Sequence, residues 1–159
     1  MTEKSWHFGQ FTPLNWRGAL GAACLVMAGE PLAAGQFEVF AARCLDPFEH
    51  FTPPIVQGLE PMEAEAGYSA YGLPEGFVLI YETPPAQDLA ACTVLGRPAR
   101  GNVLEFEIWA IDQVAIGRYE EIEAGRWLST DWIEPKVAVE LDVTAEAVAM
   151  RVRETDLES

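Results

Sequence analysis

Residues 102–127 read NVLEFEIWAIDQVAIGRYEEIEAGRW, and this stretch decides the fold. Apolar side chains alternate over residues 104–110, which predicts a strand because successive side chains of a strand point to opposite faces. Asp112 then offers an N-cap oxygen, and apolar residues recur at helical spacing over residues 115–122. The sequence therefore predicts a strand that feeds a short helix.

The predicted helix ends in a group of carboxylates, Glu120, Glu121 and Glu123. A glutamate can act as a general acid–base when burial raises its pKa toward neutrality. Glu123 is the first catalytic candidate, because the small residues Ala124 and Gly125 beside it would let a substrate approach, and Glu121 is the second. The alternative is a solvated helix end, since surface glutamates far outnumber catalytic ones.

Length and composition are typical of a folded domain. The chain has 159 residues, of which 50% are apolar, so it can bury a stable core without disulfides or a structural metal. We expect one domain over residues 1–159, with an aromatic N-terminal arm at residues 1–16 and a frayed tail at 154–159. Apolar runs are too short for a membrane span, so no membrane association is expected.

The charge is strongly acidic. There are 25 Asp and Glu residues against 10 Lys and Arg, which gives a formal net charge of −15. Such a surface repels nucleic-acid phosphates and anionic lipids, which argues against nucleic acid as a partner. It would attract a basic protein, although dispersed acids are also common in proteins that are merely soluble.

The three cysteines, Cys24, Cys44 and Cys92, show no CxxC spacing and lie among apolar residues. This pattern predicts reduced core thiols and a cytoplasmic location. Neither His7 nor His50 has nearby acids at metal-ligand spacing, so we expect no metal site. No phosphate-binding loop or cofactor motif occurs, and we expect no cofactor.

The remaining pattern consists mainly of strands. Strands are predicted at residues 19–27, 77–81, 91–95 and 136–143, and a long irregular segment at residues 47–67. Residues 37–45 are ambiguous between strand and short helix, and Thr144 is expected to cap a final helix at residues 145–153. The fold class is therefore α+β, with a small mixed or antiparallel sheet, or a barrel, and short helices.

Three colinear segments resemble the C-terminal domain of allophanate hydrolases, which has a gamma-glutamylcyclotransferase-like fold. They are Ala28-Gly29-Glu30-Pro31-Leu32 with Gln36, Tyr71-Gly72-Leu73-Pro74, and Glu107-Ile108-Trp109-Ala110 with Gly117-Arg118-Tyr119. The sequence departs from the family where Ala33 and Ala34 replace polar residues. It also departs where residues 126–129 replace a glycine-rich stretch, and the substrate-cradling loop of the cyclotransferases has no counterpart.

The resemblance implies a site for a small amide, ureido or gamma-glutamyl carboxylate. In the related cyclotransferases a glutamate near the end of the corresponding helix is the general acid–base, and Glu123 falls near that place. Backbone N–H groups around Gly29, Pro31 and Leu32 would hold the carboxylate or oxyanion. Tyr71 or Trp109 would form a wall of the pocket.

Two hypotheses of different classes remain open. The first is an enzyme, or a catalytic accessory domain, that acts on such an amide or ureido carboxylate. The second is a non-catalytic acidic interaction protein, either an accessory subunit of an amidase-like enzyme or an inhibitor of a basic partner. Trp127 and Trp132 beside Asp131 and Glu134 are its anchor candidates. A homodimer is also conceivable, with the strand at residues 136–143 pairing across the dimer if it is an edge.

Overall fold

The computed structural model describes residues 34–83, 89–130, 133 and 136–155. The chain divides into two compact units, Met1–Pro31 and Leu32–Ser159, and every element described below belongs to the second. The predicted aromatic arm at residues 1–16 and the predicted strand at residues 19–27 lie outside the described residues.

The second unit contains a helical segment, four strands, a long helix and four more strands. The helical segment consists of α1 (Gln36–Phe40), a π-helical turn (Ala41–Leu45) and α2 (Asp46–Glu49). The first four strands are β1 (Pro61–Glu65), β2 (Tyr68–Gly72), β3 (Val78–Glu82) and β4 (Ala91–Gly96). The long helix α3 (Arg100–Ala115) precedes β5 (Tyr119–Glu123), β6 (Arg126–Ser129), β7 (Val137–Val143) and β8 (Val148–Glu154).

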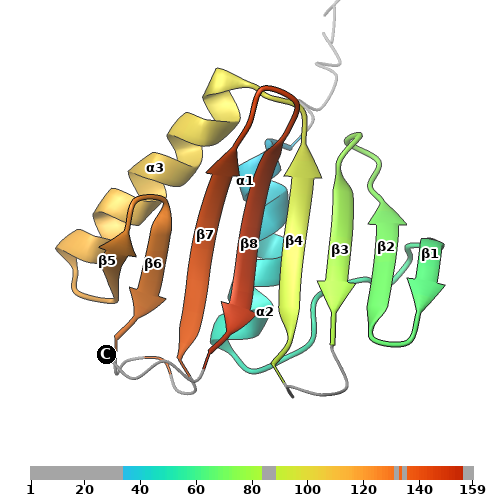
Figure 1. Cartoon of the computed structure of the whole chain (residues 1–159), viewed down its shortest axis with the longest axis horizontal. Coiled ribbons are helices and arrows are strands. Elements are labelled where there is room, and N and C mark those ends of the chain that lie inside the picture. Colours follow the sequence, from blue (N-terminus) through green and yellow to red (C-terminus); the bar gives the residue numbers. More distant parts are fainter. Residues whose placement is uncertain (1–33, 84–88, 131–132, 134–135, 156–159) are drawn as a thin grey trace, which may run out of the picture. The chain divides into compact units, whose positions relative to one another are not determined.

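All eight strands form one antiparallel sheet, ordered β1-β2-β3-β4-β8-β7-β6-β5. Each half of the sheet is a four-stranded meander preceded by a helix, and the halves join where β4 pairs with β8. Figure 1 shows the helices on a single side of this sheet. The α+β class and the antiparallel sheet are thus confirmed. The sheet is open rather than closed into a barrel, because β1 and β5 end it.

The core lies between the helices and one face of the sheet. Alternate residues of β8, Val148, Met150 and Val152, are fully buried, as period-two packing requires. Phe106 and Ala110 bring the inner face of α3 against this layer. The aromatic side chains of the core meet around Phe106, whose ring centroid lies 5.4 Å from that of Trp127.

The predicted order of elements in residues 102–127 is wrong. The expected strand at residues 104–110 is the middle of α3, and Asp112 lies inside that helix rather than at an N-cap. The expected helix instead begins within the last turn of α3 and continues into β5, which forms a hairpin with β6 that turns at Gly125 with φ 76°. The alternating pattern misleads here because α3 is apolar on two sides. Its apolar residues therefore do not form the single stripe that marks an amphipathic helix.

The predicted final helix at residues 145–153 is also wrong, since residues 148–154 form β8. The Thr144 hydroxyl oxygen does accept backbone N–H bonds from Glu146 and Ala147, at 3.3 and 3.0 Å. Those bonds close the turn between β7 and β8 instead of starting a helix. Nor is Glu154 frayed, because its backbone N–H donates to the Ala90 carbonyl at 2.9 Å.

The prediction of reduced thiols is wrong for Cys44 and Cys92, which form a disulfide between the π-helical turn and β4. Cys24 lies outside the described residues. Disulfides persist mainly in oxidising compartments, so this bond argues against the cytoplasmic location, which stays a prediction.

Three strands were predicted correctly, at residues 77–81, 91–95 and 136–143, and they correspond to β3, β4 and β7. Residues 37–45 are helical, and the segment at residues 47–67 contains most of α2 and all of β1. Strand β7 lies between β6 and β8, so it is not an edge that could pair across a dimer.

Candidate functional site

Glu123 lies beside the turn of the β5–β6 hairpin, at the last residue of β5. Its side chain is 69% exposed and pairs with Arg126 at 3.1 Å. It does not stand at a helix end or in a closed pocket, which is where a buried general acid–base would need to be. Its catalytic role stays a prediction to which this geometry adds no support.

The other predicted site residues are not gathered around Glu123. Tyr71 lies on β2, and the sheet order places β2 and β5 near opposite ends of the sheet. Trp109 packs in the core, with its ring centroid 5.4 Å from that of Tyr119. Gly29, Pro31 and Leu32 lie outside the described residues. Of the predicted catalytic and substrate-binding residues that the structure describes, Glu121 lines a groove between α3 and the β5–β6 hairpin.

Helix α3 presents a second apolar side to solvent. Leu104, Ile108, Ile111 and Ala115 follow one another at spacings of four, three and four residues and are all exposed. Ile111 is 68% exposed. This is the a/d spacing of a coiled-coil seam, so the four side chains form one stripe along the helix. These four residues are the outer stripe.

A groove runs beside the outer stripe, between α3 and the β5–β6 hairpin. It has a volume of about 380 Å³ and is lined by Glu107, Ala110, Ile111, Val114, Ala115, Glu121 and Trp127. Two of its residues, Ile111 and Ala115, also belong to the outer stripe. Trp127 is only 8% exposed, so it is not the protruding anchor that the sequence suggested. Trp132, Asp131 and Glu134 lie outside the described residues.

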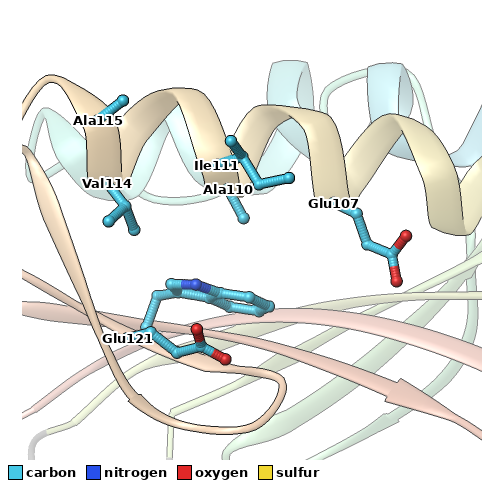
Figure 2. A pocket seen from close by; sticks show the side chains of 7 residues that line it. Glu107, Ala110, Ile111, Val114, Ala115 and Glu121 are labelled. Carbon is cyan, nitrogen blue, oxygen red and sulfur yellow. The ribbon is translucent and has the colours of Figure 1, made fainter.

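The rim of the groove is acidic. Figure 2 shows the side chains of Glu107 and Glu121 reaching toward the groove, the first from α3 and the second from β5. Exposed Glu105, Glu107 and Asp112 flank the outer stripe at the positions that set partner choice in coiled coils. Apolar surface bordered by carboxylates suits a partner that is apolar and basic at once.

A partly buried polar cluster holds β5 in place beside the helical layer. The Tyr119 hydroxyl donates to Glu49 Oε1 at 2.7 Å, and Arg118 Nη2 donates to Glu49 Oε2 at 2.7 Å. Burial raises the pKa of the Tyr119 hydroxyl, and the Glu49 charge and hydrogen bond raise it further. Because Tyr119 begins β5, this cluster fixes the strand from which Glu121 projects.

The spacing of the outer stripe is present in the sequence. The alternation of apolar residues over 104–110 predicts a strand, however, and a strand hides the heptad spacing of Leu104, Ile108, Ile111 and Ala115. The groove beside it could not have been found from residues alone. It depends on the hairpin folding back beside α3.

None of the helices in the described part of the chain is long and apolar enough to cross a membrane. The same residues contain no group of three or more His, Cys, Asp or Glu side chains placed to hold a metal ion. Comparison with protein-family models, curated proteins and solved structures gave no match for this chain.

Proposed function

We propose that the chain is a non-catalytic interaction protein that binds an amphipathic, basic helix of a partner protein along α3. The observation that carries the proposal is the outer stripe, an exposed coiled-coil seam bordered by acids and a groove. A helix is stabilised mainly by burying its apolar face, so an apolar stripe left in water favours a docked partner.

The charges beside the seam favour a basic partner. Glu105, Glu107 and Asp112 flank the seam, and only Arg100, at the start of α3, adds a basic residue there. A second copy of α3 is a poor occupant. In a parallel pair Glu107 of one helix lies across the seam from Asp112 of the other, and in an antiparallel pair centred on the stripe Glu105 of one helix lies across from Asp112 of the other. Like charges across a seam disfavour pairing, whereas Lys and Arg of a partner would complement it.

The groove adds a place for side chains that project from the docked helix. Its floor is apolar, with Ala110 and Trp127 buried beneath it, and Glu121 faces α3 from the hairpin. A large apolar side chain of the partner would rest on Trp127, and a neighbouring Lys or Arg would reach Glu107 or Glu121. This mode of recognition is a helix lying in a hydrophobic groove.

The test uses a synthetic helical peptide with Leu and Ile at the seam positions and Lys at the flanking positions, titrated by calorimetry. We expect saturable binding that weakens with salt, and no binding of the matched peptide with Glu at the flanks. Ile111→Asp should weaken binding by about tenfold or more, since it places a charge in the seam. Unchanged binding in this variant, or equal binding of both peptides, would overturn the proposal.

A matched pair of variants isolates the charge of the groove. Glu121→Lys and Glu120→Lys each change the net charge from −15 to −15 + 2 = −13. Neighbouring strand residues point to opposite faces, so only Glu121 faces the groove. We expect Glu121→Lys to weaken binding of the basic peptide and Glu120→Lys to leave that binding nearly unchanged. Equal effects would mean that only the overall charge matters.

The second candidate function is the hydrolysis of a small amide or ureido carboxylate, together with a gamma-glutamylcyclotransferase-like fold. The observation that favours it is the position of Glu121 at the groove, opposite Glu107. A pair of carboxylates can divide the roles of acid and base when their surroundings differ. Screening allophanate and gamma-glutamyl amines for turnover, with Glu121→Gln as the comparison, tests this candidate. Turnover that Glu121→Gln abolishes would favour the enzyme over the interaction protein.

A further inference from the structure

A second cavity lies at the end of α2, away from the groove beside α3. It has a volume of about 140 Å³ and is lined by Phe48, Phe51, Thr52, Pro53, Tyr81, Ala90 and Glu154. Three of these side chains are aromatic and one is a carboxylate. The cavity shares no residue with the α3 groove, so its function can be tested separately.

Phe51 is held in an unusual backbone conformation at this cavity. Its φ is 56°, the left-handed region that favours glycine, and no other described non-glycine residue has a positive φ. The Phe51 N–H donates to the Phe48 carbonyl at 3.1 Å, and the Thr52 N–H donates to the Pro47 carbonyl at 2.9 Å. These are the two bonds of a Schellman motif, in which the left-handed position is usually glycine. A bulky residue there is an outlier, and such outliers cluster at functional sites.

Glu154 supplies a negative charge to the same cavity. Its Oε2 atom accepts the Ala90 backbone N–H at 2.9 Å, which fixes the carboxylate against β4. Within residues 34–83, 89–130, 133 and 136–155, no Lys, Arg or His side chain pairs with it. Burial raises the pKa of the Tyr81 hydroxyl, and the negative charge of the nearby Glu154 carboxylate raises it further.

We propose that this cavity binds a methylated ammonium group, with Phe48, Phe51 and Tyr81 as aromatic walls and Glu154 as the counter-charge. The negative faces of aromatic rings attract alkylated ammonium ions, and such cages are their usual receptors. An ordinary ammonium is less suitable, because it is more strongly hydrated than an alkylated one and would lose that water against three aromatic walls. An anion is repelled by Glu154.

The backbone of Phe51 fits this role. Glycine would satisfy the Schellman motif at lower conformational cost, but it would remove one wall of the cavity. The aromatic ring therefore stands at a position where the backbone conformation by itself favours glycine. Binding is the simplest reason for keeping it.

The experiment follows amide chemical shifts of the full chain while choline is added. The control ligand is its neutral isostere, in which a quaternary carbon replaces the nitrogen. We expect choline to shift the amides of Phe51 and Ala90 saturably and the isostere to bind more weakly. A peptide carrying trimethyllysine, run in parallel, distinguishes a protein source of the group from a free small molecule. Equal binding of choline and its isostere, or no saturable shift with either cationic probe, would overturn the proposal.

Two variants and one matched control complete the test. Phe51→Gly should weaken binding by about two- to thirtyfold while raising the melting temperature, a combination that unfolding cannot produce. Glu154→Gln should weaken binding by about tenfold, because the amide can still accept from Ala90 but carries no charge. Glu82→Gln removes one charge from the β3 residue next to Tyr81, outside the cavity lining, and should leave binding unchanged. Binding that survives both cavity variants would show that the rings and the carboxylate are not the site.

Discussion

Phe106 and Ile108 stand two residues apart on α3 and face opposite surroundings: Phe106 is fully buried, whereas Ile108 is 52% exposed. In a strand they would share a face, but in a helix two residues turn the chain by more than half a circle. The relationship separates the two functions of α3. One side completes the core, and the other is the seam of the proposed interface.

The pair gives a direct prediction on stability. Phe106→Ala should lower the free energy of unfolding by about 3–5 kcal/mol, since it empties a packed aromatic site. Ile108→Ala should change it by less than about 0.5 kcal/mol, as expected for a surface position. Urea unfolding of both variants checks this. The strand predicted from sequence required a loss of about 2–5 kcal/mol for Ile108→Ala. A loss of that size would mean that α3 is turned the other way.

The strands that could be predicted have one unambiguous period. In β7, buried Val137 and Val139 alternate with Ala138 and with the polar Glu140, and the prediction was right. In β8 the residues Val148 and Val152 satisfy both a helical and an alternating pattern, so local sequence could not decide between them. Pairing with β4 and β7 decided it, and that is a long-range interaction.

The site was less predictable than the fold. The acidity of residues 120–123 was visible, but the direction in which each acid points depended on whether they form a helix or a strand. As a strand they alternate, which turns Glu121 toward α3 and Glu120 away from it. The cavity at Phe51 joins segments that are far apart in the sequence, so residue patterns could not have revealed it.

The disulfide gives a second prediction. Cys44 and Cys92 are fully buried and separated by 48 residues, so the bond restricts a long loop of the unfolded chain. Replacing both by Ala should lower the free energy of unfolding by about 2–4 kcal/mol under oxidising conditions. Adding a reductant should destabilise the wild type and leave the double variant unchanged. Thiol titration of the unfolded, unreduced wild type that finds both cysteines free would show that the bond does not form.

Gln36 and Gly96 give a third prediction, at the join between the two halves of the sheet. Gln36 is fully buried, and its Nε2 donates to the carbonyls of Val94 and Val148 at 3.0 and 2.8 Å. A Cβ added at Gly96 would clash with Gln36 Oε1. Gly96→Ala should therefore destabilise the fold by about 1–3 kcal/mol, because the amide must move from its acceptors.

A double-variant cycle tests that cause. In a Gln36→Ala background the clash is absent, so Gly96→Ala should lower the free energy of unfolding by less than it does in the wild type. The difference between the two losses, the coupling energy, should be about 0.5–3 kcal/mol. Gly101→Ala is the control, since a Cβ there meets nothing within 4 Å. It should stabilise α3 slightly through helix propensity. Additive effects of the two substitutions would show that Gln36 is not what Gly96 accommodates.

The Tyr119 hydroxyl gives a fourth prediction, on pH. Its pKa is raised in the folded protein, mainly by burial and then by the charge of Glu49. Below the ordinary Tyr pKa of 10.0 the hydroxyl is protonated in both the folded and unfolded states, so its contribution to stability is fully present. Above that pH the unfolded chain loses the proton while the folded chain keeps it. The free energy of unfolding should therefore fall as the pH rises above 10.0.

Tyr119→Phe separates this effect from the other groups that titrate at high pH. At neutral pH the free energy of unfolding of the variant should be lower by about 1–3 kcal/mol. The reason is that Glu49 loses the hydrogen bond from the Tyr119 hydroxyl while it keeps the one from Arg118. As the pH rises above 10.0, the free energy of unfolding of the variant should fall less than that of the wild type. The two curves of unfolding free energy against pH should therefore converge. Urea unfolding at a series of pH values measures both parts. Parallel curves would mean that Tyr119 ionises in the folded protein as easily as in the unfolded chain, and that Glu49 is not close enough to hold its proton.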